Sequence, residues 1–225
     1  MVLKYMTLKS LAAALLLTIV AIPSLAWPQT PRDLLLASAS GQLAVVAASL
    51  TAGVHVDVRD GRGRTPLLIA THNNREDVAR LLIASGADVN AKDKIEDTPF
   101  LYAGAEGRNA ILKLILVAGA NLKDTNRYGG TALTPAAHHG HAQTVAILLK
   151  TKIDVNQVNK LGWTALLEAI ILGSGGVVHT DIVRQLLQAG ANPNISDGDG
   201  ISPLAHARRR GELCGKVGDG VKNAA

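Results

Sequence analysis

Thr65-Pro66-Leu67 begins a pattern that returns as Thr98-Pro99-Phe100, Thr131-Ala132-Leu133 and Thr164-Ala165-Leu166, each 33 residues after the one before. Recurrence at one fixed spacing is the signature of a chain built from repeated supersecondary units. Ser202-Pro203-Leu204 follows after 38 residues, so the unit before it is five residues longer than the others. The sequence therefore predicts consecutive units stacked along one axis.

The five additional residues lie within the stretch Gly173 to Val178, because the pattern that begins at His141 resumes at His179. Counting 33 residues back from Thr65 places the start of another unit at Arg32. The predicted repeat domain covers residues 32–211, with units at 32–64, 65–97, 98–130, 131–163 and 164–201 and a partial unit at 202–211.

Each unit carries start and stop signals for a first helix. Thr or Ser before Pro places an N-cap ahead of a residue whose missing N–H would have no helical partner in any case. Nine residues after each start comes a residue that can end this helix in the left-handed conformation. These helix-ending residues are Gly41, Gly107, Gly140, Gly173 and Gly211, with Asn74 in the second unit.

The second helix of a unit carries an apolar triplet such as Leu81-Leu82-Ile83 and ends before a Gly-Ala pair, as at Gly86-Ala87. Lys152-Ile153 interrupts this pattern, and a residue other than Gly in a left-handed cap costs up to about 1 kcal/mol. Turns rich in Asn, Asp and Gly, such as Asp88 to Asp93, predict hairpins between units. Asp197-Gly198-Asp199-Gly200 has some resemblance to a calcium-binding loop, but the Glu that would bind calcium through both carboxylate oxygens is missing. We therefore expect this stretch to be another such hairpin.

The composition agrees with packed helices. Apolar residues make up 48% of the 225 residues and aromatic residues only 3%, so we expect a core of Leu, Ile, Val and Ala. β-Sandwiches and barrels depend on aromatic and β-branched residues, which makes them poor candidates. The single cysteine, Cys214, excludes a disulfide framework and every zinc cluster built from several cysteines.

Residues Met1 to Ala26 have the features of a secretory signal. Two lysines precede an apolar core from Leu11 to Ile22, and Ser24-Leu25-Ala26 supplies a small-x-small cleavage site. The apolar run of about a dozen residues is shorter than the roughly 18 to 20 that a spanning helix needs. We expect cleavage before Trp27, export to the periplasm or the exterior, and no stable membrane insertion afterwards. An uncleaved leader that anchors a scaffold is the alternative.

The repeated residues resemble the ankyrin-repeat family, and together with the leader they resemble an exported, bacterial-type ankyrin-repeat domain. The resemblance covers about residues 32–211. It implies an all-α solenoid of helix-turn-helix units joined by β-hairpin turns. One departure is that the family's usual His after Thr-Pro-Leu is absent, so its hydrogen bonds between neighbouring turns are not expected. The residues in its place are Leu68, Leu101, Thr134, Leu167 and Ala205.

The two ends of the repeat array differ from its middle. The unit 32–64 has weak apolar positions at Ala48-Ser49-Leu50, and we expect it to be the N-terminal cap. Glycines at 215, 218 and 220 oppose a second helix in the last unit, so residues 212–225 are predicted to be a disordered tail. Ile182 and Leu187 would then form an uncovered edge, and end-to-end self-association would follow.

Sites for chemistry are scarce in this sequence. His138-His139-Gly140-His141 comes nearest to a metal site, but no Cys or carboxylate nearby completes a tetrahedron, and we expect neither metal nor cofactor. The alternative is a hydrolase or metal-dependent enzyme that uses His138 and His139 with Ser174 or Asp181, near the 173–178 insertion. Gly173-Ser174-Gly175 lacks the spacing of a nucleophile elbow, so we predict no catalysis.

The charge balance does not favour nucleic acid as a partner. Removal of Lys4 and Lys9 with the leader leaves 21 basic and 18 acidic residues, a net charge of +3. The short run Arg208 to Arg210 is typical of a solvated helix end.

The remaining functional surface is the one that the family resemblance implies, a concave face lined by hairpin tips and first-helix ends that binds a protein partner. We expect Trp163 and Tyr128 to be its centre, because exposed aromatic and Arg side chains dominate interface hot spots. Packing of both rings against neighbouring hairpins is the structural alternative. The predicted partner-binding residues are Trp163, Tyr128, Leu161, Arg127, Ile95, Lys94, Arg62, Arg64, Lys160, His138 and His139.

The leader generates a direct prediction. The exported chain should begin at Trp27 and be recovered free of membranes, because the cleavage site follows an apolar run too short to span. N-terminal sequencing of the exported protein measures this. Recovery of membrane-bound protein with an intact Met1 would show that the leader is an anchor.

Overall fold

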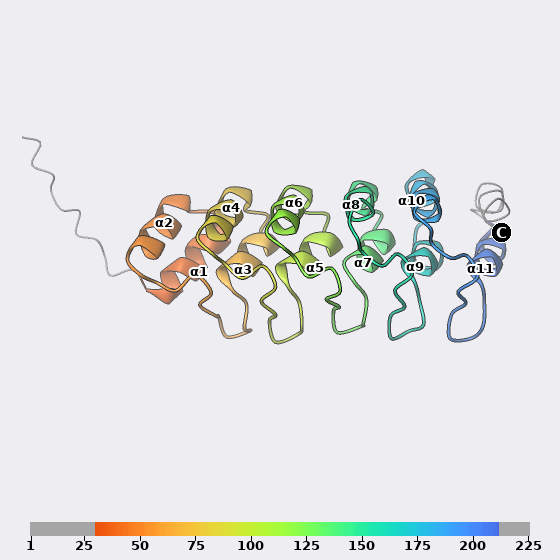
Figure 1. Cartoon of the computed structure of the whole chain (residues 1–225), viewed down its shortest axis with the longest axis horizontal. Coiled ribbons are helices and arrows are strands. Elements are labelled where there is room, and N and C mark those ends of the chain that lie inside the picture. The colour runs from red at the N-terminus through yellow and green to blue at the C-terminus, as the bar shows by residue number, and fades with distance from the viewer. Residues whose placement is uncertain (1–29, 212–225) are drawn as a thin grey trace, which may run out of the picture.

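The computed structural model describes residues 30–211, which form a row of stacked helix pairs (Figure 1). The first helices of the units are α1 (Pro31–Ser40), α3 (Pro66–His72), α5 (Pro99–Ala105), α7 (Leu133–His138), α9 (Ala165–Ile171) and α11 (Pro203–Arg210). The second helices are α2 (Leu43–Thr51), α4 (Glu76–Ala84), α6 (Asn109–Val117), α8 (Ala142–Leu148) and α10 (Val177–Gln188). No strand occurs in residues 30–211, so the predicted all-α solenoid is confirmed.

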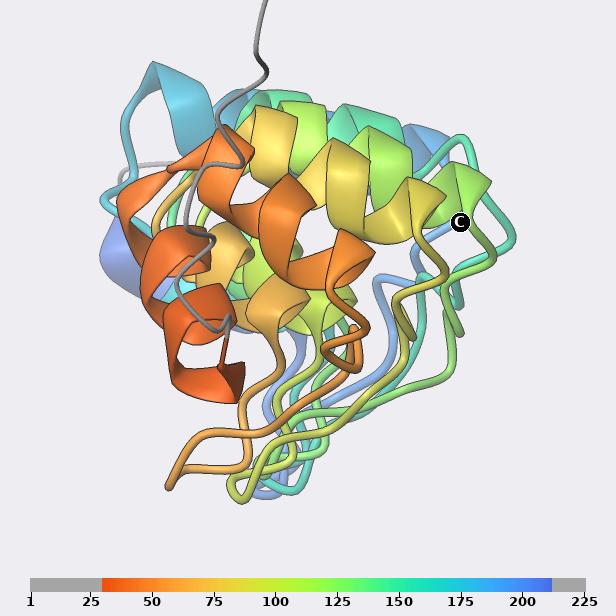
Figure 2. The ribbon, with the colours of Figure 1, turned by 90° about the vertical axis from the view of Figure 1, so that its left-hand side faces the viewer.

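The two helix rows lie on one side of the molecule, and the hairpins project from the other side (Figures 1 and 2). Consecutive first helices pack on one another, and each second helix packs on the first helix of its own unit. Within residues 30–211, none of the helices combines the length and apolar character that crossing a membrane requires. The predicted signal, Cys214 and the predicted tail lie outside the described residues.

The predicted Thr and Ser caps form at most helix starts. Thr65 and Thr98 accept the backbone N–H of the residue three positions later, at 3.3 and 3.1 Å. Thr164 and Ser202 cap in the same way. The first unit begins two residues before the predicted start, because Thr30 caps α1 there in a capping box.

The predicted cap at Thr131 is wrong, and Pro135 supplies the reason. In the other units the carbonyl of the cap residue accepts the N–H of the residue four positions later. Pro135 has no N–H, so the Thr131 carbonyl accepts from Thr134 instead, at 3.2 Å. The helix then begins at Leu133, and the buried Thr131 hydroxyl has no hydrogen-bond partner in the described chain.

Two predicted helix ends also differ from the structure. Gly173 is not left-handed, and Gly175 adopts that conformation instead. A Cβ at position 173 would overlap the Ala169 carbonyl and the His179 ring, so Gly is required there for close packing. Lys152 incurs no left-handed strain, because α8 ends early and the Thr151 hydroxyl accepts the N–H of Ile153 at 3.2 Å.

The core is one continuous set of buried apolar side chains from Leu34 in α1 to Ala207 in α11. Ile182 and Leu186 are fully buried, and Leu187 is half-buried against the same core. The expected uncovered edge at Ile182 is therefore wrong, and Leu187 is only partly accessible at this end of the array.

One hairpin position generates a stability prediction. Gly63, Gly129, Gly162 and Gly200 have positive φ at equivalent places, whereas Glu96 occupies this place at φ 68°. A side chain in the left-handed region costs about 1–2 kcal/mol, which exceeds the unfolded-state entropy that Gly adds. Glu96→Gly should raise the free energy of unfolding by about 0.5–1 kcal/mol in denaturant titration.

Gly200→Ala is the matched control, because a Cβ at this left-handed position has no atom within 4 Å. It should lower stability through backbone conformation alone. A loss of stability in Glu96→Gly would contradict the strain assigned to Glu96.

Candidate binding groove

Every hairpin is shaped by one Asp or Asn side chain. In the fourth unit, Asn159 Oδ1 accepts the backbone N–H groups of Leu161 at 2.9 Å and Trp163 at 3.0 Å. The N–H of Asn159 donates to the Trp163 carbonyl at 2.9 Å, which closes the loop. The equivalent residues are Asp60, Asp93, Asn126 and Asp197. The composition of these turns predicts only that hairpins form, whereas the repeat spacing marks these individual residues.

The first helices are tied to the following unit by side chains that bind their last carbonyls. The Arg75 guanidinium donates to the Ala39 carbonyl at 3.0 Å, and His139 Nδ1 lies 2.8 Å from the Ala105 carbonyl. Donors are favourable there because helix C-termini carry partial negative charge and unpaired carbonyls. His139 is exposed, and one of its ring nitrogens is bound to a carbonyl of the preceding unit.

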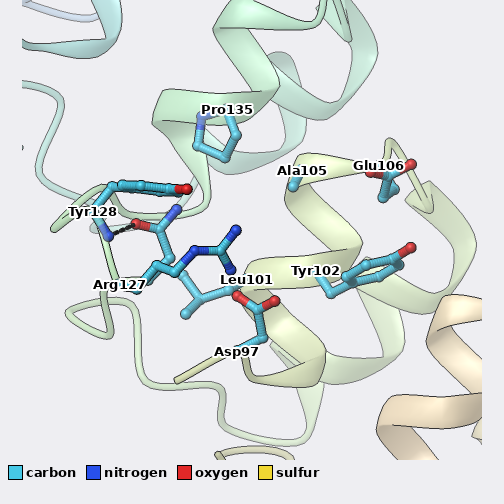
Figure 3. A pocket seen from close by; sticks show the side chains of 9 residues that line it. Asp97, Leu101, Tyr102, Ala105, Glu106, Arg127, Tyr128 and Pro135 are labelled. Carbon is cyan, nitrogen blue, oxygen red and sulfur yellow. Dashed lines mark hydrogen bonds between the residues drawn. The ribbon is translucent and has the colours of Figure 1, made fainter. Parts of the chain in front are cut away.

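A groove of about 410 Å³ lies between α7, α9 and the hairpins 126–130 and 159–163. A smaller cavity of about 160 Å³ lies on the other side of hairpin 126–130, against α5 (Figure 3). The groove is lined by Asn126, Arg127, Tyr128, Gly130, Thr134, Pro135, His138, His139, Asn159, Leu161, Glu168 and Leu172.

Exposed apolar side chains surround the groove. Tyr128 is 54% exposed, Leu161 58% and Leu172 43%.

The Arg127 guanidinium lies 4.7 Å from the centre of the Tyr128 ring, and its head is directed toward Asp97 in the smaller cavity (Figure 3). Burial and the nearby Asp93 raise the pKa of Asp97, which Arg127 partly opposes.

The groove contains one buried carboxyl group, that of Glu168, whose residue is 8% exposed. Its Oε1 accepts a 2.8 Å hydrogen bond from Asn159 Nδ2, and its Oε2 lies 3.8 Å from His138 Nδ1. Burial raises the pKa of Glu168, and the neighbouring His139 and the hydrogen bond from Asn159 oppose that rise in part. Burial and the neighbouring His139 and His179 lower the pKa of His138, which disfavours an ion pair between His138 and Glu168.

The predicted partner-binding residues separate into two groups. Arg127, Tyr128, Leu161, His138 and His139 meet in the groove. The others lie elsewhere on the hairpins. Lys94 Nζ and Lys160 Nζ each donate at 2.8 Å to a carbonyl of the preceding hairpin, and Arg64 forms a 2.7 Å ion pair with Asp60. Trp163 is half-buried, and Arg62 and Ile95 are exposed on earlier hairpins.

The residues of the enzyme alternative serve other contacts. Ser174 Oγ lies 3.1 Å from His179 Nδ1, while His179 Nε2 lies 2.9 Å from the His138 carbonyl. These bonds hold the 173–178 insertion against the preceding unit. Asp181 forms an exposed 2.7 Å ion pair with Arg184. No group of three or more His, Cys, Asp or Glu side chains suited to a metal occurs in the described part of the chain.

Glu168 generates a pH prediction. Because its folded pKa is raised, the native state binds the proton more tightly than the unfolded state, and stability falls as pH rises through its titration. Glu168→Gln keeps an acceptor for Asn159 but has no charge. The melting temperature of this variant relative to the native chain should therefore increase between about pH 4 and about pH 8.

Glu96→Gln is the control for this measurement, because Glu96 is exposed on hairpin 93–97 and forms no ion pair within residues 30–211. If the melting temperature difference between Glu168→Gln and the native chain does not change with pH, ionisation of Glu168 does not lower the stability of the folded state.

Comparison with known proteins agrees with this architecture. The family model for ankyrin repeats in three copies matches residues 34–126 and 100–197. The crystal structure of an ankyrin repeat domain from Acinetobacter baumannii AYE is 50% identical, with a TM-score of 0.83 over 87% of this chain and 98% of its own. The ankyrin repeat protein EF0377 is 39% identical, with a TM-score of 0.80 over 84% of this chain and 98% of its own.

Among curated proteins, the ankyrin repeat protein YahD of Escherichia coli (strain K12) is 49% identical over 45 residues. This match covers 20% of the present chain and 22% of YahD. The family model extends over most of the repeat array described above. The chain belongs to the ankyrin-repeat family.

Proposed function

We propose that this chain is an exported, non-catalytic interaction module that binds a protein partner through the groove between residues 126–139 and 159–172. Ankyrin repeats are generally protein–protein interaction modules, and solenoids present extended concave surfaces for binding. Export is supported by the leader at residues 1–26 alone.

The observation that carries the proposal is the set of apolar side chains around the groove. Tyr128, Leu161 and Leu172 are each more than 40% exposed and border one concavity. Arg127 and His139 add polar groups at its margin. A small apolar centre with a polar rim is the usual anatomy of a protein interface.

The proposal is tested by isolating the partner from the exported fraction with the purified chain and then measuring its affinity for variants. Leu161→Ala and Tyr128→Ala should each weaken binding by about 2 kcal/mol if they are hot-spot residues, with unchanged thermal unfolding. Trp163→Ala shows whether its half-buried ring also contributes to the interface.

Val117→Ala is the matched control, because Val117 is 90% exposed on α6, in the helix row away from the hairpins (Figure 1). It should leave affinity unchanged. Loss of binding in Val117→Ala with full binding in Leu161→Ala would place the interface on the opposite face.

A further inference from the structure

The groove contains a buried carboxyl group without a cation. Glu168 Oε1 accepts a hydrogen bond from Asn159, and His138 Nδ1 lies 3.8 Å from Oε2. Within residues 30–211, no Lys or Arg nitrogen lies within 4.0 Å of Glu168. An ionised carboxylate held away from water is costly unless a cation and hydrogen bonds compensate it.

The cations close to this groove are engaged with other groups. The Arg127 guanidinium lies over the Tyr128 ring and faces the smaller cavity, where Asp97 lies (Figure 3). Lys160 Nζ donates to the Arg127 carbonyl at 2.8 Å. Of the histidines, His138 has a lowered pKa, and His139 Nδ1 is bound to the Ala105 carbonyl. The chain itself therefore leaves the acceptor capacity of Glu168 Oε2 for another molecule.

Apolar side chains form part of the walls of this groove. Tyr128, Pro135, Leu161 and Leu172 line the same groove of about 410 Å³ as Glu168. Apolar side chains beside the Glu168 carboxyl group suit a ligand side chain that has a long aliphatic stem and a positively charged end.

Lysine fits these constraints better than arginine. The planar guanidinium of Arg binds carboxylates best through two parallel hydrogen bonds, which need both carboxylate oxygens. Asn159 already donates to Oε1, so a bidentate guanidinium would have to share that oxygen with the Asn159 amide. The ammonium of Lys is a compact charge that one accepting oxygen can bind, and its methylene groups can pack on the apolar walls.

We propose that the groove receives a lysine side chain of the protein partner, with its ammonium group at Glu168 Oε2 and its methylene groups against Leu161, Leu172 and Tyr128. This inference rests on the proposed function and adds the chemistry that the partner must present.

The test uses random peptides displayed on phage and selected on the immobilised full chain. Selected peptides should share a lysine, and replacing this lysine by norleucine should weaken binding about tenfold or more, because the charge-assisted hydrogen bond is lost. On Glu168→Gln, the lysine and norleucine peptides should bind about equally. Glu106→Gln, which changes a carboxylate of the smaller cavity, should keep the preference for lysine.

The outcomes separate this inference from the proposed function. Peptides that lose binding on Leu161→Ala but bind equally with lysine or norleucine contradict the lysine site and leave the groove as the interface. Selection of acidic peptides whose binding depends on Arg127 would likewise contradict the lysine site and leave the groove as the interface. If no selected peptide loses binding on Leu161→Ala, both the proposed function and the lysine site are contradicted. If Glu168→Gln does not fold, the norleucine comparison on the native chain decides.

Discussion

No unit of this chain can bury its apolar side chains without its neighbours. Leu67, Phe100, Leu133 and Leu166 stand at equivalent places after each helix start and are all fully or almost fully buried. Consecutive first helices pack closely enough that a Cβ on Gly104 would lie 2.7 Å from the Ala132 Cβ. This packing fixes the spacing between units, and the spacing in turn aligns the hairpins that border the groove.

The candidate groove and the smaller cavity each adjoin a departure from the regular repeat. Backbone hydrogen bonds join hairpin 60–64 to 93–97, from Lys94 to Arg62, and hairpin 126–130 to 159–163, from Lys160 to Tyr128. The structure gives no such bond between hairpins 93–97 and 126–130, and the smaller cavity lies there. Pro135 changes the start of α7 beside the larger groove.

The sequence predicts the fold because helix caps, apolar positions and turns recur in every unit and support one another. It fails where a contact between units decides the local conformation. Gly173 was expected to end a helix, but the His179 ring packs where its side chain would be. Thr131 was expected to cap α7, but a proline four residues later removes the N–H that its carbonyl would bind.

The candidate site is only partly predictable for the same reason. Hairpin numbering is sufficient to place Arg127, Tyr128 and Leu161 on one face, and the structure brings these three together. Glu168 was not predicted, because equivalent positions hold Ile69 and Tyr102 and nothing in the pattern marks a carboxylate. Its importance depends on burial and on the hydrogen bond from Asn159, which become visible only when hairpin and helix are placed in space.

The central claim is that the concave groove, and not the row of second helices, is the binding surface. Hydrogen exchange of the chain with and without its bound partner tests this most directly, because it maps the contact without any substitution. We expect slower exchange in residues 126–139 and 159–172 when the partner is bound, with exchange in α4 and α6 unchanged. Protection confined to α4 and α6 would contradict this claim.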